Sequence, residues 1–426
     1  MNTLNKRLAQ AKPSATYRII DRVAARRAEG AKIISLCAGE PDFDTPDHIR
    51  QAGIDAIRNG HTRYTQVAGI RALREAVAQK FRRENGLDVT WQDTLVSNGG
   101  KHVIYNALAA TLNEGDEVIM PAPYWVSYPE MVELCGGTAR IVACSAEQGF
   151  KLTPEALAAA ITPNTRWLIL NSPSNPTGAV YSQPELQALA NVLLEHPHVL
   201  VLADDIYEHL LFDGQTFHTL AQVEPRLAPR VLTMNGVSKA YAMTGWRIGF
   251  ATGPRWLLEA MEKLQGQQTS GASAISQHAA IAALSGPQDF IRQSRGVFEK
   301  RRDRVVAFLN KTPGLTCANP SGAFYAFANC AGLLGRTTPA GKLLQTDEDV
   351  AHALLEEANV AVVHGSAFGL APYLRIAYAL DDDSLLQACE AIRQFCAATR
   401  CNDEHCHCGE QACPALGCEA APAVYN

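Results

Sequence analysis

The sequence has no apolar run that approaches the ~20 residues a bilayer-spanning helix needs. Its first residues, MNTLNKRLAQAKPSATY, lack the apolar region of a secretory signal, so we expect no leader. A strong excess of either charge is also missing, because the formal net charge is −5. This balance argues against nucleic acid or an anionic membrane as the main partner. We therefore expect a cytoplasmic protein.

Cysteines with the paired C-x2-C spacing of a structural zinc site are absent, although the sequence has twelve cysteines. Seven are scattered and are typical of small buried apolar residues in a reducing compartment: Cys37, Cys135, Cys144, Cys317, Cys330, Cys389 and Cys396. The other five lie with two histidines in residues 401–426. We predict that this tail is disordered and that the protein has no metal site. A soft metal bound by the tail is the alternative.

The composition is that of a chain with sizeable cores. Its 426 residues are 47% hydrophobic and 19% charged, which favours two domains over one. The pattern changes character near residue 315. We predict a large domain over 45–315, a smaller α+β domain over 316–400, and an N-terminal segment, 1–44, that packs with the smaller domain.

Helix-like and strand-like segments alternate through the large domain. Apolar residues recur one turn apart in three segments that we expect to be helices: 69–85, 101–112 and 182–196. Strands are expected in five segments: 94–100, 116–121, 165–178, 198–210 and 230–235. These strands are continuous apolar runs, which favours an α/β fold with a buried parallel sheet and helices on both faces.

Polar residues gather where four of these strands end. The four groups are Gly99-Gly100-Lys101, Asn171 to Asn175, Asp204 to Tyr207, and Ser238-Lys239. In an open parallel sheet, ligands bind at the carboxyl ends of the strands. We therefore expect one pocket that contains phosphate donors, an acid, a phenol, an amide and a lysine.

Each of these groups matches a different part of one ligand. Gly99 and Gly100 open a helix, whose N–H groups can bind a phosphate, and Ser238 and Arg247 can add further donors. Lys239 can form a Schiff base with an aldehyde.

The remaining groups fit a flat heteroaromatic ring. Asp204 can keep a pyridine nitrogen protonated, Tyr207 and Asn175 can hydrogen-bond a ring oxygen, and Trp125 can stack on the ring. The ligand that combines a phosphate, an aldehyde, a phenolate oxygen and a pyridine nitrogen is pyridoxal 5'-phosphate. We predict this cofactor.

The motifs that carry these residues resemble those of the fold-type I, pyridoxal-phosphate-dependent aminotransferases. The resemblance is to the aspartate aminotransferase family (class I/II), in the bacterial subgroup that carries GEPDFDTP. It rests on KPSAT (12–16), AGEPDFDTP (38–46), SNGGK (97–101), PYWVSYPEM (123–131), NSPSNPTGAVY (171–181), DDIYEHL (204–210), NGVSKAYAMTGWRIGF (235–250), PSGAFY (320–325) and YLRIAYA (373–379). The motifs follow the family's order and spacing over about residues 1–400. The resemblance implies a large domain with a mostly parallel seven-stranded sheet, plus a smaller α+β domain.

By position, the resemblance implies the residues that hold the cofactor. Lys239 is the catalytic Schiff-base lysine, Asp204 lies at the pyridine nitrogen, and Tyr207 and Asn175 lie at the ring oxygen. The phosphate, the ring face or the pocket mouth is surrounded by Gly99, Gly100, Lys101, Trp125, Ser238 and Arg247. Tyr64 is implied to reach the phosphate of the neighbouring subunit in a homodimer with shared active sites.

The resemblance also implies the substrate contacts. Arg375 matches the arginine that grips the substrate α-carboxylate, and the residues beside it are Gly39, Trp125 and Asn175. Lys101 and residues 12–16 match positions suited to a distal carboxylate. These positions favour aspartate or glutamate, with 2-oxoglutarate or oxaloacetate as acceptor.

The reaction implied is a ping-pong transfer in which Lys239 acts as general acid–base at the substrate Cα. A prephenate or aromatic amino acid aminotransferase is the alternative, and a lyase with the same cofactor is less favoured. Related transcription regulators carry an extra N-terminal domain, for which we expect no room here. Two positions depart from the family pattern, Asp205 in place of glutamate and His364 in place of proline. His364 is a candidate for a role in specificity.

Overall fold

The computed structural model describes residues 5–11 and 15–401. A seven-stranded sheet forms its centre, in the order β2 (Thr94–Ser97), β8 (Gly249–Thr252), β7 (Val231–Gly236), β6 (Leu200–Asp204), β5 (Thr165–Asn171), β3 (Glu117–Ala122) and β4 (Thr138–Ala143). Every neighbouring pair is parallel except the two that involve β8. The expected α/β fold with a mostly parallel sheet is confirmed.

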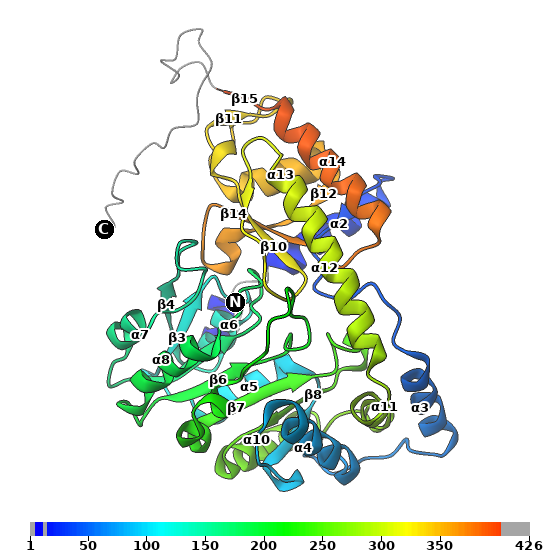
Figure 1. Ribbon diagram of the computed structural model, residues 1–426, viewed down its shortest axis with the longest axis vertical. Coiled ribbons are helices and arrows are strands. Elements are labelled where there is room, and N and C mark those ends of the chain that lie inside the picture. The colour runs from blue at the N-terminus through cyan, green and yellow to red at the C-terminus, as the bar shows by residue number, and fades with distance from the viewer. Residues whose placement is uncertain (1–4, 12–14, 402–426) are drawn as a thin grey trace.

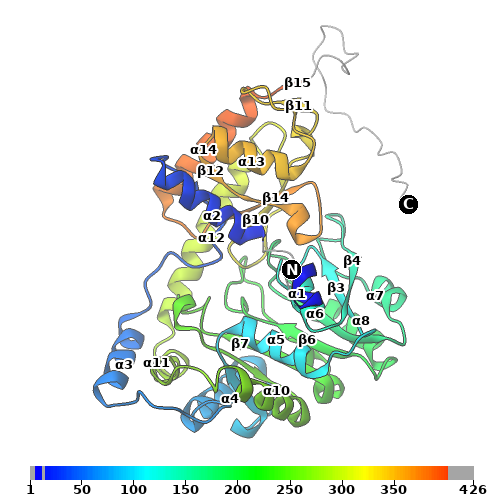
Figure 2. The ribbon, with the colours of Figure 1, turned by 180° about the vertical axis from the view of Figure 1, so that it is seen from behind.

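Helices cover both faces of this sheet (Figures 1 and 2). The helices of this part of the chain are α3 (Asp47–Arg58), α4 (Arg71–Asn85), α5 (Gly100–Thr111), α6 (Tyr128–Leu134), α7 (Pro154–Ala160), α8 (Gln183–Leu194), α9 (Leu220–Val223), α10 (Arg255–Gln268) and α11 (Ala274–Ser285). Their apolar residues form two clusters, one with Leu168 and Leu170 of β5 and the other with Trp167 and Ile169. Alternate residues of one strand therefore enter different cores, which explains the continuous apolar runs.

Local sequence fixes where the sheet helices begin. At α8, the Ser182 and Glu185 side chains form a capping box, and Pro184 stands in the first turn. Leu186, Leu189 and Leu193 then recur on the face that packs in the core. This face makes α8 a cover for the sheet rather than a free surface helix.

A smaller part of the chain packs above the carboxyl edge of the sheet (Figure 1). Its sheet has the order β13 (Val363–His364), β14 (Tyr373–Ala377), β10 (Tyr325–Asn329) and β9 (Thr316–Cys317). Two further pairs join β1 (Ile34–Ser35) to β12 (Val360–Ala361) and β11 (Arg336–Thr337) to β15 (Arg400–Cys401). Its helices are α12 (Asp289–Leu309), α13 (Asp347–Glu357) and α14 (Asp382–Ala398).

The N-terminal elements attach to different parts. Helix α2 (Ala15–Ala28) buries Ile19 and Val23 beside Phe327, Leu355 and Val363 of the smaller part. Helix α1 (Lys6–Gln10) lies near α6 instead. The division of the chain at residues 44 and 315 stays a prediction. Of the predicted disordered tail, 401–426, Cys401 lies in β15 and so is ordered, and residues 402–426 lie outside the described residues.

Helix α12 links the two parts of the molecule (Figure 2). Ile291, near its start, packs in the core of the large sheet. Phe298, Val305 and Leu309 pack in the core of the smaller part. The chain therefore passes from one core to the other within a single helix.

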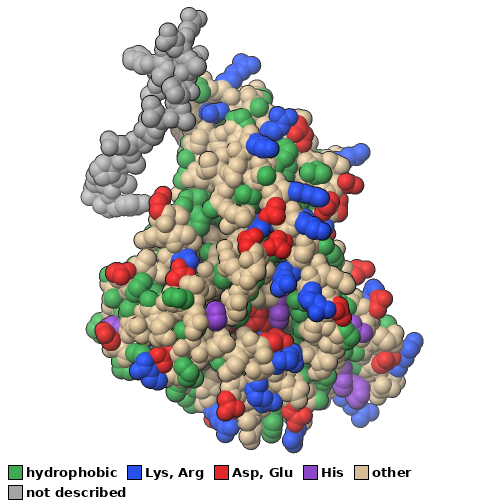
Figure 3. All heavy atoms as spheres, viewed as in Figure 1, with side chains coloured by type: hydrophobic (Ala, Val, Ile, Leu, Met, Phe, Trp, Pro, Cys, Tyr) green, Lys and Arg blue, Asp and Glu red, His purple; other side chains and the backbone are tan. Residues whose placement is uncertain are grey.

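The surface carries mixed charge. On the face drawn in Figure 3, basic and acidic side chains alternate over both parts of the molecule. Within the described residues, no helix is both long and apolar enough to cross a bilayer.

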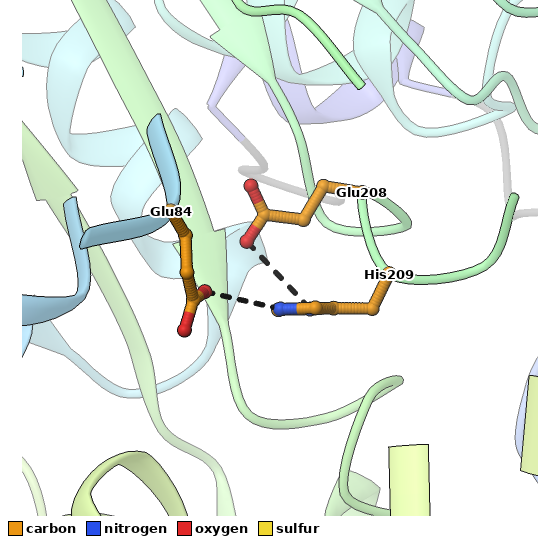
Figure 4. A group of neighbouring side chains, drawn as sticks. All are labelled: Glu84, Glu208 and His209. Carbon is orange, nitrogen blue, oxygen red and sulfur yellow. Dashed lines mark hydrogen bonds and ion pairs between the residues drawn. The ribbon is translucent and has the colours of Figure 1, made fainter. Parts of the chain in front are cut away.

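A buried ionic cluster joins α4 to the segment that follows β6 (Figure 4). Glu84, Glu208 and His209 bring their ligand-type atoms within 4.8 Å of one another, as in many metal sites. The ammonium of Lys80, which is 1% exposed, already lies there, ion-paired with Glu208 and 3.6 Å from Glu84 Oε2. Lys80 also donates to Asn85 Oδ1 at 2.7 Å. The lysine thus supplies the cation of this cluster.

Replacing Lys80 should destabilise the protein strongly. Lys80→Met leaves the Glu208 carboxylate buried without its counter-ion, which should lower the free energy of unfolding by about 3–5 kcal/mol. Lys342→Met is the matched control, because its pair with Asp349 is partly exposed and should contribute less than about 1 kcal/mol. Denaturant unfolding of both variants checks this, and equal losses would contradict it.

Candidate active site

A cavity of about 420 Å³ lies at the carboxyl edge of the central sheet, below the smaller part. It collects most of the residues predicted from the sequence: Gly39, Gly100, Lys101, Trp125, Asn175, Asp204, Tyr207, Ser238, Lys239, Arg247 and Arg375. Gly99 stands just behind this lining, at the start of α5. Tyr64 lies elsewhere, with 95% of its surface exposed. The structure therefore brings together all the predicted residues except Tyr64.

Lys239 lies in the turn that follows β7 and is partly buried. Its ammonium donates a hydrogen bond to the Gly39 carbonyl and lies 5.9 Å from the centre of the Tyr207 ring. Burial lowers the pKa of Lys239 to about 8; Glu40 opposes this shift, and Arg247 and Arg375 add to it. A substantial fraction of the amine is therefore neutral near physiological pH.

Asp204 is the last residue of β6 and is buried. Its Oδ2 accepts the hydroxyl proton of Tyr128 at 2.5 Å, and its Oδ1 accepts the Ile206 N–H at 3.3 Å. Its backbone carbonyl accepts from Asn171 Nδ2 at 2.9 Å. Burial raises the pKa of Asp204 to about 6, and the Tyr128 bond works against that shift. The side chain is thus an acid that a cationic partner would keep ionised.

Arg375, on β14, is a buried cation that no acidic side chain of the described residues pairs with. Nη1 donates to Asn175 Oδ1 at 3.1 Å and Nη2 to the Cys37 carbonyl at 2.6 Å. The guanidinium lies 4.7 Å from the centre of the Tyr325 ring. A buried guanidinium held only by neutral acceptors is prepared for an anionic ligand.

Tyr207 also lines the cavity. Its hydroxyl lies 2.7 Å from that of Tyr325, which comes from β10 of the smaller part. Burial raises the pKa of Tyr207 well above its usual value, so the phenol stays protonated and can donate. The hydroxyl pair joins the two parts of the molecule at the site.

The start of α5 forms an anion-binding end of the cavity. Gly99 precedes the helix with a φ of 87°, a left-handed conformation that glycine adopts readily. A Cβ there would collide with the Arg247 guanidinium. The first N–H groups of a helix have no acceptor within it, so those of Gly100 and Lys101 can bind an anion beside Arg247 and the buried Ser238.

Lys101 lies at the mouth of this cavity, where it is exposed. Its ammonium lies 4.9 Å from the Trp125 ring centre and 5.9 Å from that of Tyr17, on α2. Partial loss of water, and secondly the charge of Arg247, lower the pKa of Lys101. Of the KPSAT segment, residues 12–14 lie outside the described residues, and Thr16 lines the cavity.

The structure adds two residues that the sequence reasoning missed, Tyr128 and Tyr325. Both occur in quoted motifs, PYWVSYPEM and PSGAFY, but a tyrosine among apolar residues is typical of packing. Tyr128 lies three residues after Trp125, a spacing that places both on one side of a helical turn. That spacing was the available signal.

His364 lies outside this cavity. It lines a second one of about 450 Å³ between α2 and α13, together with Arg18, Glu348 and His352. Its Nδ1 is 2.7 Å from Ser366 Oγ. Its proposed part in specificity stays a prediction, and direct contact with a ligand in the first cavity has no support.

Comparison with known proteins agrees with this geometry. Residues 31–392 match the sequence model described as aminotransferase class I and II. The chain belongs to this family. It is 56% identical over 393 residues to the probable aspartate/prephenate aminotransferase of Rhizobium leguminosarum bv. phaseoli, covering 92% of this chain and 98% of the relative. It is 55% identical over 397 residues to the aspartate/prephenate aminotransferase of Cereibacter sphaeroides, covering 93% and 99%.

Solved structures of aminotransferases are also similar to this chain. The aspartate aminotransferase of Rhizobium meliloti superposes with a TM-score of 0.91 at 51% identity, over 94% of this chain and 100% of that one. The aspartate aminotransferase of Thermus thermophilus with maleate has a TM-score of 0.86 at 41% identity, over 93% and 100%. The protein is an aminotransferase of fold-type I that uses pyridoxal 5'-phosphate, and the predicted family, fold, enzyme class and cofactor are confirmed.

The residues of the cavity fit this cofactor. The helix start beside Arg247 suits a phosphate, the buried Asp204 suits a basic ring nitrogen, and the Tyr207 hydroxyl suits a ring oxygen. The lowered pKa of Lys239 makes its amine available to an aldehyde. Each functional group of the cofactor therefore has a chemically suitable partner in the cavity.

The pKa of Lys239 predicts how cofactor uptake depends on pH. The neutral amine attacks an aldehyde, so the uptake rate of cofactor-free enzyme should rise with pH and level off above about 8. Stopped-flow absorbance of the cofactor measures this rate, with Lys239→Arg as the control that forms no covalent link. A rate that keeps rising to about pH 10, the usual lysine pKa, would show that burial does not act on this amine.

Proposed function

We propose that this aminotransferase exchanges an amino group between aspartate or glutamate and a 2-oxo acid such as 2-oxoglutarate or oxaloacetate. The observation that carries the proposal is that the cavity holds two cations, Arg375 and Lys101, besides Lys239 and Arg247. Arg375 is buried at the inner end without an acidic partner in the described residues, and Lys101 lies at the mouth. Two separated cations suit a substrate with two carboxylates.

Arg375 binds the substrate α-carboxylate through its guanidinium, which Asn175 and the Cys37 carbonyl hold in place. Gly39 lies beside it, and a side chain there would collide with the Tyr325 hydroxyl. Trp125 also lines the cavity, with its ring 4.9 Å from the Lys101 ammonium. Lys101 binds the distal carboxylate.

Lys239 carries the proton transfer. Pyridoxal 5'-phosphate, when bound, supplies an electrophilic carbonyl and a ring that accepts the electron pair from the substrate Cα. The neutral Nζ of Lys239 would take the proton from the substrate Cα and hold it for return, as a general acid–base. Asp204, as a carboxylate, would accept a hydrogen bond from a protonated ring nitrogen, and Tyr207 and Asn175 would donate to the ring oxygen.

The phosphate end is held by the remaining predicted residues. Gly99 and Gly100 give backbone donors, and Ser238 and Arg247 give side-chain donors. Trp125 stacks on the ring face.

The eight cysteines of the described residues are unpaired, which supports the reducing compartment of a cytoplasmic enzyme.

Prephenate or an aromatic amino acid is the second candidate substrate. The names of the relatives from Rhizobium leguminosarum and Cereibacter sphaeroides support it, because both contain prephenate. Prephenate also has two carboxylates, so the same pair of cations suits it. The aromatic rings of Tyr17 and Trp125 at the cavity mouth suit an unsaturated ring.

Single-turnover kinetics of the holoenzyme with an amino-acid panel test the proposal. Aspartate and glutamate should transfer their amino group to the cofactor with the highest kcat/KM. Prephenate should serve as an amino-group acceptor. Apolar amino acids should react more slowly, because they leave Lys101 without a partner. If alanine or valine reacts as fast as aspartate, the dicarboxylate assignment is wrong.

Lys101→Ala should separate the substrate classes. Loss of one charge-assisted contact should lower kcat/KM for aspartate by roughly ten- to a thousandfold, or about 1.5–4 kcal/mol, and aromatic substrates should change far less. Arg375→Ala should harm both classes. Lys311→Ala, at an exposed lysine outside the cavity, is the matched control. Equal losses for aspartate and phenylalanine would mean that Lys101 serves the cofactor or the fold.

Tyr64 supports a further proposal, a homodimer in which this residue completes the neighbouring site. A tyrosine that is 95% exposed has no packing role within its own chain. If Tyr64 contacts the phosphate of the other subunit, Lys239→Ala and Tyr64→Ala subunits should each be impaired alone. Mixed dimers should regain activity, because one of their two sites has both residues intact. Mixtures that stay as inactive as the separate variants would contradict a shared site.

A further inference from the structure

Tyr128 is a buried hydroxyl whose role the proposed reaction leaves open. It begins α6, is 2% exposed and lines the cavity. Its O–H donates to Asp204 Oδ2 at 2.5 Å. Within the described residues, the Asp204 carboxylate accepts one hydrogen bond from a side chain, that of Tyr128, and one from the Ile206 backbone N–H.

The hydroxyl is held rigidly. The Tyr128 N–H donates to the Trp125 carbonyl at 3.0 Å, and the two rings meet edge to face with centres 5.3 Å apart. The ring packs in the core formed by α5, α6 and the central strands. A donor fixed in this way can set the orientation of the carboxylate as well as its charge.

The direction of the hydrogen bond follows from the charges around it. Burial raises the pKa of Tyr128 well above its usual value, so the phenol keeps its proton. The groups that face Asp204 are Tyr128 from α6, Asp205 and Tyr207 from its own segment, and Lys239 from the turn after β7. Of these, Tyr128 and Lys239 favour the ionised carboxylate, and burial opposes it.

We propose that Tyr128 is a positioning residue that keeps Asp204 ionised and aimed at the ring nitrogen of the cofactor. The proposal rests on the role of Asp204 proposed above. A donated hydrogen bond makes the carboxylate less basic. The proton that Asp204 shares with the ring nitrogen then stays on the nitrogen, where it is needed for the ring to accept electrons.

The first test uses the cofactor-free protein and needs no activity. Infrared titration, with Asp204→Asn to assign the band, measures the pKa of Asp204. Tyr128→Phe keeps the ring and its packing on Trp125 but removes the donor. It should raise that pKa by roughly one to two pH units. Tyr325→Phe, which removes a cavity hydroxyl that bonds Tyr207 and not Asp204, should leave it unchanged. An unchanged pKa in Tyr128→Phe would overturn the proposal.

The second test uses the holoenzyme and separates this inference from the role of Asp204. Tyr128→Phe should lower kcat roughly ten- to a hundredfold for aspartate and aromatic substrates alike, with little change in KM. Asp204→Asn should lose more. If Asp204→Asn is inactive and Tyr128→Phe matches the parent enzyme, the Tyr128 inference alone fails. If Asp204→Asn keeps full activity, the proposed role of Asp204 fails, and the inference with it.

Discussion

Burial of opposite charges in one cavity is the constraint on which the site depends. Asp204 and Lys239 both leave water at the carboxyl edge of the sheet, and burial moves their pKa values toward neutrality from opposite sides. The acid rises to about 6 and the base falls to about 8. Lys239 can therefore exchange a proton near pH 7, and the Tyr128 hydrogen bond and the Lys239 charge favour the ionised form of Asp204.

The two-part architecture creates this burial. The strands β6 and β7 end at Asp204 and just before Lys239, and the smaller part closes over them with Tyr325 and Arg375. Because α12 contributes to both cores, the closing part is attached by a continuous helix. A buried cation at Arg375 is tolerated because Asn175 and the Cys37 carbonyl solvate it.

Much of the fold and site could be predicted, because apolar strands and the polar residues that end them are local patterns. The expected strand over 198–210 is too long, since β6 ends at Asp204 and the following residues turn back toward α4. The antiparallel β8, the Tyr128–Asp204 bond and the Tyr207–Tyr325 pair depend on contacts between distant segments. The periodicity of one sequence does not specify which distant segments contact one another, so these features could not be predicted.

Reduction of the holoenzyme with borohydride, followed by peptide mass spectrometry, tests the central claim most directly. Lys239 should carry the reactive amine, because burial lowers its pKa and the Gly39 carbonyl orients it. The pyridoxyl group should therefore appear on the peptide that contains Lys239 and on no other lysine. A label on Lys101, or a protein that carries none after incubation with pyridoxal 5'-phosphate, would contradict the account.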